Sequence, residues 1–249
     1  MFVSKYCASG NDFILFHTFR KGDFTALAKR VCNRHYGLGA DGLIVLYPHD
    51  EVDFEWDFYN ADGSHAAMCG NGSRAAALYA HQNGLCAPKL SFMTQAGLIA
   101  ASVEEEGIVE SELTPPNVLK ESFEEEGLTW WQIDTGVPHL IAFVDDISLF
   151  DKTTARIMRN RYNSNVNFAK VVDARNLMVR TYERGVEDET LACGTGMAAS
   201  YYRALLEKRI EQHIVVKPTS GEKLYLGMNE RTITFKGKVE RVFDTTITM

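Results

Sequence analysis

The chain has 249 residues, 45% of them apolar, which is enough for a substantial core in one large domain or two of ordinary size. Its net charge of −7, without a long cluster of Lys or Arg, gives no electrostatic footprint for nucleic acid or an anionic membrane, so we expect a small-molecule partner. No stretch approaches the roughly 18 apolar residues of a membrane span. The first residues lack a signal-peptide pattern, and we therefore expect a cytoplasmic protein.

Strands and helices alternate in the predicted first half. Strands are expected at 2–6, 13–16, 43–47, 52–58, 89–94 and 98–103. A helix over 23–33 can be capped by Asp23 and has one apolar face. A second helix follows Cys69, and its stretch 75–80 has no charge on any face, so we expect other elements to enclose it.

The cysteines form an odd set without the spacing of a known framework. They are Cys7, Cys32, Cys69, Cys86 and Cys193. An odd number without a CxxC pair argues against a disulfide scaffold and against a four-thiolate zinc site. Cys32 lies on the apolar face of the first predicted helix, which favours a packed core thiol.

Two similar stretches lie half a chain apart. They are Cys69-Gly70-Asn71-Gly72 and Cys193-Gly194-Thr195-Gly196, and 193 − 69 = 124 residues separate them. At the same offset Gly221 falls opposite Gly97, each in a predicted hairpin turn. The order strand, turn, Cys-Gly-x-Gly, helix, hairpin thus occurs twice, whereas the helix at 23–33 has only a blurred counterpart near 148–160.

This repeat predicts an α/β (α+β) fold of two pseudo-symmetric domains, each a mixed sheet or barrel wrapped round a central buried helix. We expect the active site in the cleft between them. Acidic runs at 104–106 and 124–126, with Pro115-Pro116 between them, surround the expected boundary, and the runs themselves are typical of solvated faces or loops. The predicted domains are 1–116 and 117–240, with a last strand over 241–249 completing the first.

A cysteine in the first turn of a helix is disposed to form a thiolate, because the helix dipole and the backbone N–H groups lower its pKa below about 8.5. Glycines there leave N–H donors able to hold a carboxylate. With one such thiol on each side of a substrate α-carbon, one sulfur removes the α-proton and the other returns a proton on the opposite face. A single Cys-Gly-x-Gly is more often a small buried residue in a turn, but its recurrence favours a shared site. No Schiff-base lysine motif and no GxGxxG loop is evident, which indicates a cofactor-free reaction.

Six stretches carry a family resemblance. They are Gly10-Asn11-Asp12-Phe13, Phe58-Tyr59-Asn60-Ala61-Asp62-Gly63-Ser64, Met68-Cys69-Gly70-Asn71-Gly72, Asn165-Val166-Asn167-Phe168, Tyr182-Glu183-Arg184-Gly185 and Glu189-Thr190-Leu191-Ala192-Cys193-Gly194-Thr195-Gly196. In this order they resemble the diaminopimelate epimerase family. The resemblance implies a pyridoxal-independent two-cysteine epimerase that interconverts LL- and meso-2,6-diaminopimelate for lysine and cell-wall precursor synthesis. It also implies two pseudo-symmetric domains and a homodimer.

The resemblance assigns roles by position. Cys69 and Cys193 would be the acid/base thiols, and backbone at Gly70, Asn71, Gly194 and Thr195 would hold the α-carboxylate. Asn11, Asn60, Asn165 and Arg184 would recognise the distal amino-acid end, while Glu183 would contact substrate and, with His139, tune a thiol pKa. Taken alone, Asn60 is typical of a turn, Arg184 of a surface charge and His139 of a structural histidine.

The chain departs from the family pattern at several positions. Val137 stands where the family commonly has Asn, which removes one polar contact to the distal end, and Phe243 stands where a dimer-contact Tyr is often found. The stretch Tyr6-Cys7-Ala8-Ser9 replaces Met-His-Gly-Leu, and neither Cys7 nor Cys86 has a family role.

Two alternatives stay open at this point. One is a two-thiol racemase for another amino acid, similar to the proline racemases. The other is a non-catalytic amino-acid-binding or thiol redox protein, which would bind ligand without isotope exchange at the α-carbon. A zinc site is disfavoured because no His shares ligand spacing with either Cys69 or Cys193.

Overall fold

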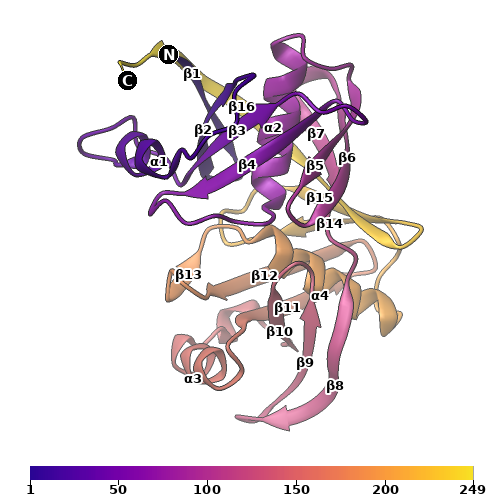
Figure 1. The fold of residues 1–249 in the computed structure, drawn as a ribbon. Helices are drawn as coiled ribbons and strands as arrows, with labels where there is room; N and C mark the ends of the chain where they lie inside the picture. Colours follow the sequence, from indigo (N-terminus) through magenta and orange to yellow (C-terminus); the bar gives the residue numbers. More distant parts are fainter. Residues whose placement is uncertain (249) are drawn as a thin grey trace. The chain divides into compact units, whose positions relative to one another are not determined.

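The computed structural model describes residues 1–248, which fold as two compact units (Figure 1). One unit comprises Met1–Glu112 and the chain from Gly237 onward, and the other comprises Leu113–Lys236. Across these residues there are sixteen strands and four α-helices, so the predicted mixed α/β fold is confirmed. None of the helices within 1–248 is long and apolar enough to cross a membrane.

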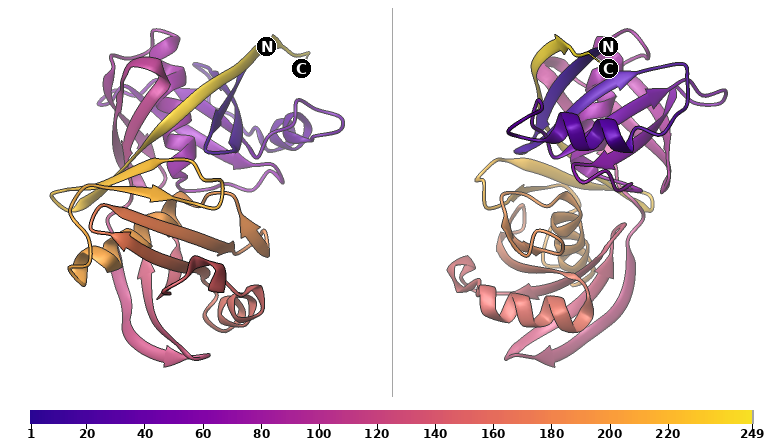
Figure 2. Two further views of the ribbon diagram at one scale, coloured as in Figure 1. Left: turned by 180° about the vertical axis from the view of Figure 1, so that it is seen from behind. Right: turned by 60° about the vertical axis from the view of Figure 1, so that its left-hand side comes forward.

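The first unit is a closed barrel of eight strands. They are β1 (Phe2–Ala8), β2 (Asn11–His17), β3 (Gly42–Tyr47), β4 (Phe54–Asn60), β5 (Lys89–Thr94), β6 (Gly97–Val103), β7 (Ile108–Glu112) and the later part of β16 (Thr232–Thr246). Consecutive strands are neighbours, and β16 follows β7 and pairs antiparallel with β1 from Val239 to Thr246, which closes the ring. The two chain ends meet here, because the Met1 amino group donates to the Ile247 carbonyl at 2.7 Å (Figure 2).

Helix α2 (Gly70–Gln82) fills this barrel. Every residue from Gly70 to Ala80 is buried, as expected for a helix without a charged face along 75–80. Its alanines are short enough for strands to approach on all sides, and they pack with aromatic side chains such as Phe13, Phe58 and Phe92. The barrel thereby fixes the direction of α2 and the position of its first turn.

Helix α1 (Thr25–Cys32) packs outside the barrel, against β3 and β4. Its buried face includes Ala28, Val31 and Cys32, and burial raises the pKa of the Cys32 thiol to about 12, which agrees with a core thiol. The N-cap residue is Phe24, not Asp23, although the Asp23 carboxylate accepts from the Thr25 N–H at 2.8 Å.

The second unit repeats this plan as an open sheet. Its strands are β8 (Asn117–Glu125), β9 (Leu128–Asp134), β10 (Pro138–Phe143), β11 (Asn165–Asp173), β12 (Asn176–Glu183), β14 (Ile214–Lys217), β15 (Leu224–Asn229) and the first part of β16, in the order β8-β9-β10-β11-β12-β14-β15-β16. A short strand, β13 (Asp188–Thr190), pairs with β12. Helix α3 (Lys152–Tyr162) connects the parallel pair β10 and β11, and two 3₁₀ turns lie at Glu105–Gly107 in the first unit and Ile147–Leu149 in the second.

The internal repeat is confirmed element by element. Helix α4 (Gly194–Leu206) has 13 residues like α2, begins 194 − 70 = 124 residues later and packs on β9 to β12. Parallel pairs flank each central helix: α2 connects β4 to β5, and α4 connects β12 to β14. Antiparallel hairpins follow both, so each half contains the same sequence of pairings.

The two acidic runs differ in structure. Glu104, Glu105 and Glu106 are exposed around the first 3₁₀ turn, as expected. The second run lies at the end of β8, where Glu125 accepts from the Tyr162 hydroxyl and pairs with Arg161 of α3. This run is therefore only partly a solvated face.

Candidate active site

Cys69 is the N-cap residue of α2. The chain reaches it in extended conformation, and its Sγ accepts a hydrogen bond from the Gly72 N–H at 3.3 Å. A Cβ at Gly72 would lie 3.3 Å from both Cys69 Cβ and Ile44 Cδ1, so glycine lets this turn close around the sulfur. The half-buried thiol therefore lies among backbone N–H groups at the positive end of a helix.

Asn11 is the second predicted residue that the first unit brings to this sulfur. Cys69 Sγ lies 3.8 Å from Asn11 Oδ1 and donates to it, while Asn11 Nδ2 donates to Asp41 Oδ2 at 2.6 Å. A carboxylate only accepts, so the amide nitrogen faces Asp41 and the amide oxygen faces the thiol. Asp41 thus determines which polar atom Asn11 presents to Cys69.

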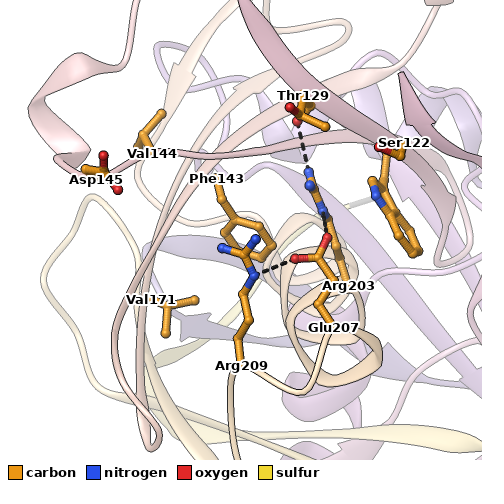
Figure 3. A pocket seen from close by; sticks show the side chains of 10 residues that line it. Ser122, Thr129, Phe143, Val144, Asp145, Val171, Arg203, Glu207 and Arg209 are labelled. Atoms are coloured by element: carbon orange, nitrogen blue, oxygen red, sulfur yellow. Dashed lines mark hydrogen bonds and ion pairs between the residues drawn. The ribbon is translucent and has the colours of Figure 1, made fainter. Parts of the chain in front are cut away.

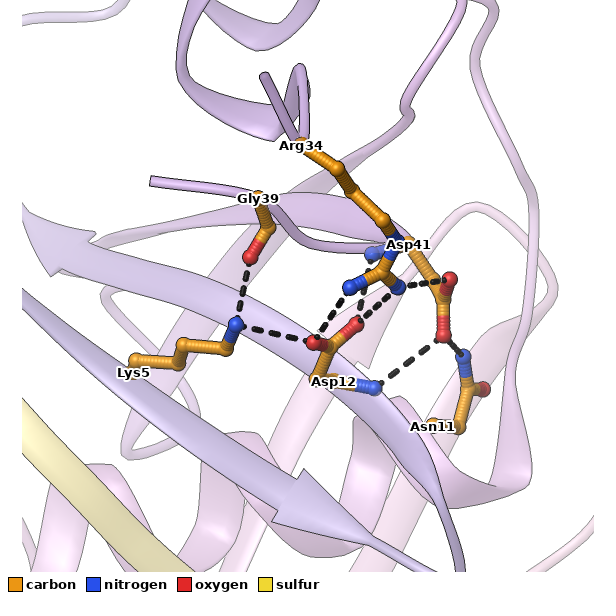
Figure 4. Close-up of polar contacts among 6 residues, drawn as sticks. All are labelled: Lys5, Asn11, Asp12, Arg34, Gly39 and Asp41. Carbon is orange, nitrogen blue, oxygen red and sulfur yellow. Dashed lines mark hydrogen bonds and ion pairs between the residues drawn. The ribbon is translucent and has the colours of Figure 1, made fainter. Parts of the chain in front are cut away.

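A cluster of charges fixes Asp41 in turn (Figure 4). The Arg34 guanidinium donates to Asp41 at 2.7 Å and to both oxygens of Asp12 at 2.8 and 3.0 Å, and Lys5 pairs with Asp12 at 2.9 Å. Burial alone would raise the pKa of Asp12, but the hydrogen bonds from Arg34 and Lys5 lower it to about 2, so its carboxyl is ionised. The sequence patterns did not predict a role for Asp41, whose stretch reads only as a loop before β3; its one signal is an acidic side chain in a glycine-rich loop.

The remaining predicted residues of this unit have local partners. Gly70 and Asn71 open α2 and are buried, and Asn71 Oδ1 accepts from Arg74 at 2.7 Å. Asn60 ends β4, where its side chain donates to Ser64 Oγ at 3.0 Å and its N–H to the Ser64 carbonyl at 2.8 Å. These contacts hold Asn60 in its own turn.

Cys193 occupies the matching N-cap position of α4 and is buried. Its Sγ lies 3.5 Å from the hydroxyl of Thr195, the second residue of the helix. A Cβ at Gly194 would lie 3.1 Å from the Phe235 ring, so this turn, too, packs closely at a glycine. A side-chain hydroxyl lies beside this sulfur, whereas a side-chain amide lies beside Cys69.

His139, on β10, lies beside Thr195 of α4 and is fully buried. Its Nε2 is 2.9 Å from Thr195 Oγ1, and its Nδ1 is 3.0 Å from the amide nitrogen of Asn167 on β11. Burial lowers the pKa of the imidazole to about 3, so the ring is neutral over the physiological range. The second unit therefore joins His139, Thr195 and Cys193 in one chain of contacts.

Asn165, Glu183 and Arg184 lie at the adjoining strand ends. Asn165 Oδ1 accepts from the Arg184 N–H at 2.8 Å, and Asn165 Nδ2 lies 3.4 Å from His139 Nε2. Glu183 is the last residue of β12, and Arg184 directs its guanidinium to the Asn163 carbonyl at 2.8 Å. The predicted residues of this unit thus gather at the start of α4, the starts of β10 and β11 and the end of β12.

A cavity of about 440 Å³ in the second unit lies away from these residues (Figure 3). Arg203, near the C-terminal end of α4, donates to Glu207 at 2.8 Å and to the Thr129 carbonyl at 3.1 Å along its wall. Its guanidinium lies over the rings of Trp131 and Phe143. None of the predicted site residues lines it.

The start of α2 and the start of α4 have the same chemical layout. Each has a thiol at the start of a buried helix, with backbone N–H groups that can hold an anion and polar side chains beside the sulfur. Burial raises the pKa of Cys7 and raises that of Cys86 to about 11, so these two thiols stay protonated. No cluster of three or more His, Cys, Asp or Glu side chains suited to a metal ion occurs within residues 1–248.

The sequence matches a family model described as diaminopimelate epimerase over residues 3–119 and 131–242. The chain belongs to the diaminopimelate epimerase family. It is 57% identical over 245 residues to the diaminopimelate epimerase of a Nitratiruptor species, covering 98% of each chain. It is 54% identical over 240 residues to that of Campylobacter lari, covering 96% of each chain. The resemblance predicted from the motifs is therefore confirmed.

The fold is also shared with a probable proline racemase from Agrobacterium radiobacter K84, solved with bound carbonate. The TM-score is 0.75 and the alignment covers 100% of this chain and 93% of that chain. At 13% sequence identity, this likeness shows a common architecture alone.

Proposed function

We propose that this chain interconverts LL- and meso-2,6-diaminopimelate without a cofactor, using one thiol from each unit. The observation that carries the proposal is the recurrence of a cysteine at the N-cap of a buried central helix in both halves of a member of this family. The reaction would serve lysine and cell-wall precursor synthesis. The substrate is a small amino acid, and the chain acts as a cytoplasmic homodimer.

At the α-carbon, the thiolate of one of the two residues Cys69 and Cys193 removes the proton, and the thiol of the other adds a proton on the opposite face. The C–H electron pair passes into the carboxylate as an enediolate-like charge, and a proton returns to carbon as the second S–H bond breaks. Backbone N–H groups of Gly70, Asn71, Gly194 and Thr195 stabilise that charge. After one turnover the protonation states of the two sulfurs are exchanged, which suits a reversible inversion.

The distal amino-acid end needs a cation for its carboxylate and acceptors for its ammonium. Arg184 supplies the guanidinium, and Asn11, Asn60 and Asn165 supply amides, with Glu183 as a carboxylate at the end of β12. In this proposal His139 acts through Thr195 on Cys193, and Glu183 also tunes a thiol. Val137 provides no polar side chain, so we expect these groups to determine the selectivity for a substrate with an ammonium and a carboxylate at each end.

Isotope exchange tests the proposal. LL-diaminopimelate in deuterated water should gain deuterium at one α-carbon without added cofactor, and either Cys69→Ser or Cys193→Ser should abolish most of this exchange. Cys86→Ser is the matched control, since it removes a half-buried thiol that has no role here. Full exchange in either of the first two variants would exclude the two-thiol mechanism.

The same assay separates the alternatives. Faster turnover of proline than of diaminopimelate would indicate a racemase similar to the proline racemases. Tight binding of diaminopimelate without exchange would indicate a binding or redox protein. Light scattering of the purified protein checks the proposed homodimer.

A further inference from the structure

Asn167 is fully buried, and its side-chain amide lies between residues of the two neighbouring strands β10 and β12. On β11 it is paired with Thr181 of β12, and it contacts His139 and Leu140 of β10. Its Nδ2 lies 2.9 Å from the Leu140 carbonyl, which can only accept, and its Oδ1 accepts from the Thr181 hydroxyl at 2.8 Å. The orientation of the amide is therefore determined by its surroundings.

This orientation decides which nitrogen of His139 carries the proton. The Asn167 nitrogen, a donor, lies 3.0 Å from Nδ1, so Nδ1 must be the acceptor and the neutral ring carries its hydrogen on Nε2. Asn165 Nδ2, at 3.4 Å from Nε2, would suit the opposite tautomer, but that tautomer would set two N–H groups against each other at 3.0 Å. The shorter contact, from Asn167 to Nδ1, therefore determines the tautomer of His139.

The tautomer in turn directs the hydroxyl of Thr195. Its oxygen accepts from His139 Nε2–H at 2.9 Å, which leaves the hydroxyl hydrogen to donate to Cys193 Sγ at 3.5 Å. A hydroxyl that donates to sulfur stabilises the thiolate over the thiol. We propose that Asn167 is a positioning residue that fixes the His139 tautomer, so that Thr195 donates to the Cys193 sulfur. The proposal rests on the proposed function only for the acid/base role of Cys193.

Gly196 gives independent support from the helix side. A Cβ at this position would lie 2.3 Å from Asn167 Oδ1 and 3.0 Å from Thr181 Oγ1. The first turn of α4 therefore packs directly on the amide, and the second glycine of the Cys-Gly-x-Gly stretch makes room for it. Asn167 is in contact with both the histidine and the helix that carries the thiol.

Alkylation of Cys193 by iodoacetamide measures its thiolate without any substrate. In a Cys69→Ser chain at neutral pH, Asn167→Leu should slow alkylation of Cys193 by about tenfold, since a change of one pKa unit changes the thiolate fraction tenfold. Thr195→Val should slow it similarly, Thr195→Ser should not, and Asn167→Leu should have no further effect once Thr195 is Val. Ser200→Ala is the matched control, because it removes a buried hydrogen bond of α4, to the Gly196 carbonyl, outside this chain of contacts.

Nitrogen-15 NMR of His139, assigned by comparison with His139→Gln, reads the tautomer directly in the unmodified chain. A hydrogen on Nε2 supports the proposal, and a hydrogen on Nδ1 overturns it even if Asn167→Leu does not fold. An unchanged alkylation rate in folded Asn167→Leu, or effects of Asn167→Leu and Thr195→Val that simply add, would also overturn it. Failure to epimerise diaminopimelate with these results intact would remove the proposed function and leave this positioning role standing.

Discussion

Replacing Asp12 by Asn should destabilise the protein near neutral pH and have almost no effect in strong acid. The Asp12 carboxylate receives two hydrogen bonds from Arg34, at 2.8 and 3.0 Å, and pairs with Lys5 at 2.9 Å. Asparagine keeps the shape of the side chain and removes its charge. The variant therefore isolates the electrostatic part of the cluster that holds Asp41 and Asn11 beside Cys69.

The lowered pKa of Asp12 gives the expected loss of unfolding free energy in Asp12→Asn. Burial alone would raise this pKa, but hydrogen bonds from Arg34 and Lys5 lower it from 3.8 to about 2. At about 1.36 kcal/mol per pH unit, the difference of about 1.8 corresponds to roughly 2.4 kcal/mol. Solvent reaches the Arg34 side chain, which is 55% exposed, so screening reduces the expected contribution to about 1–2 kcal/mol.

The sign follows from the lowered pKa. The stabilisation is fully present above the unfolded value of 3.8 and is lost as the pH falls through about 2, where the folded carboxyl takes up its proton. Urea unfolding should thus give a gap of about 1–2 kcal/mol between wild type and Asp12→Asn at about pH 6, closing toward zero near pH 2. Asp50→Asn, in an exposed loop, serves as control and should give a small gap throughout. A gap for Asp12→Asn that stays constant with pH would refute the electrostatic reasoning.

Two further predictions concern single side chains. Arg203→Met should lower the free energy of unfolding in urea by about 3–5 kcal/mol, because the buried guanidinium donates to Glu207 and to the carbonyls of Thr129 and Ile141. Arg209→Met is the control and should lower it by about 1 kcal/mol or less. Equal losses for the two variants would contradict this prediction. Asp41→Asn should speed alkylation of Cys69 roughly three- to tenfold in a Cys193→Ser chain, because Asn11 can then turn its N–H toward the sulfur. An unchanged rate would show that Asp41 does not orient Asn11.

The repeat was the part of the fold most accessible from sequence. The offset of 124 aligns α4 with α2 in sequence, because a Cys-Gly-x-Gly turn followed by an uncharged run is a local pattern that can be read without the structure. Strand β16 was less accessible. A last strand was expected over 241–249, but β16 spans Thr232–Thr246 and pairs with β15 through Lys236 and with β1 from Val239, and such a change of partner has no local signal.

The candidate site was predictable only where a motif carries it. Motifs identified the two thiols and the residues expected to bind substrate, and one of these motifs contains Asn167 without giving it a role. The roles of Asp41 and Asn167 depend on contacts between neighbouring strands and loops. One feature of the sequence points to Asn167: it lies two residues after Asn165, and two amides at that spacing share one face of a strand. A polar side chain at a buried strand position needs a partner, so such a pair is a reason to look for one across the sheet.

The two halves keep the same helix start but differ in what surrounds the sulfur. Cys69 lies between a backbone donor, Gly72, and an amide acceptor whose orientation Asp41 sets, whereas Cys193 faces a hydroxyl directed by His139. An inversion through two thiols needs one sulfur protonated and the other ionised at the start of each turnover. Identical surroundings would favour the same state for both sulfurs, so divergence around a retained helix start is what the proposed chemistry requires. The repeated helix start can therefore supply the two thiols, but the different roles of the two sulfurs have to come from the side chains that the repeat does not share.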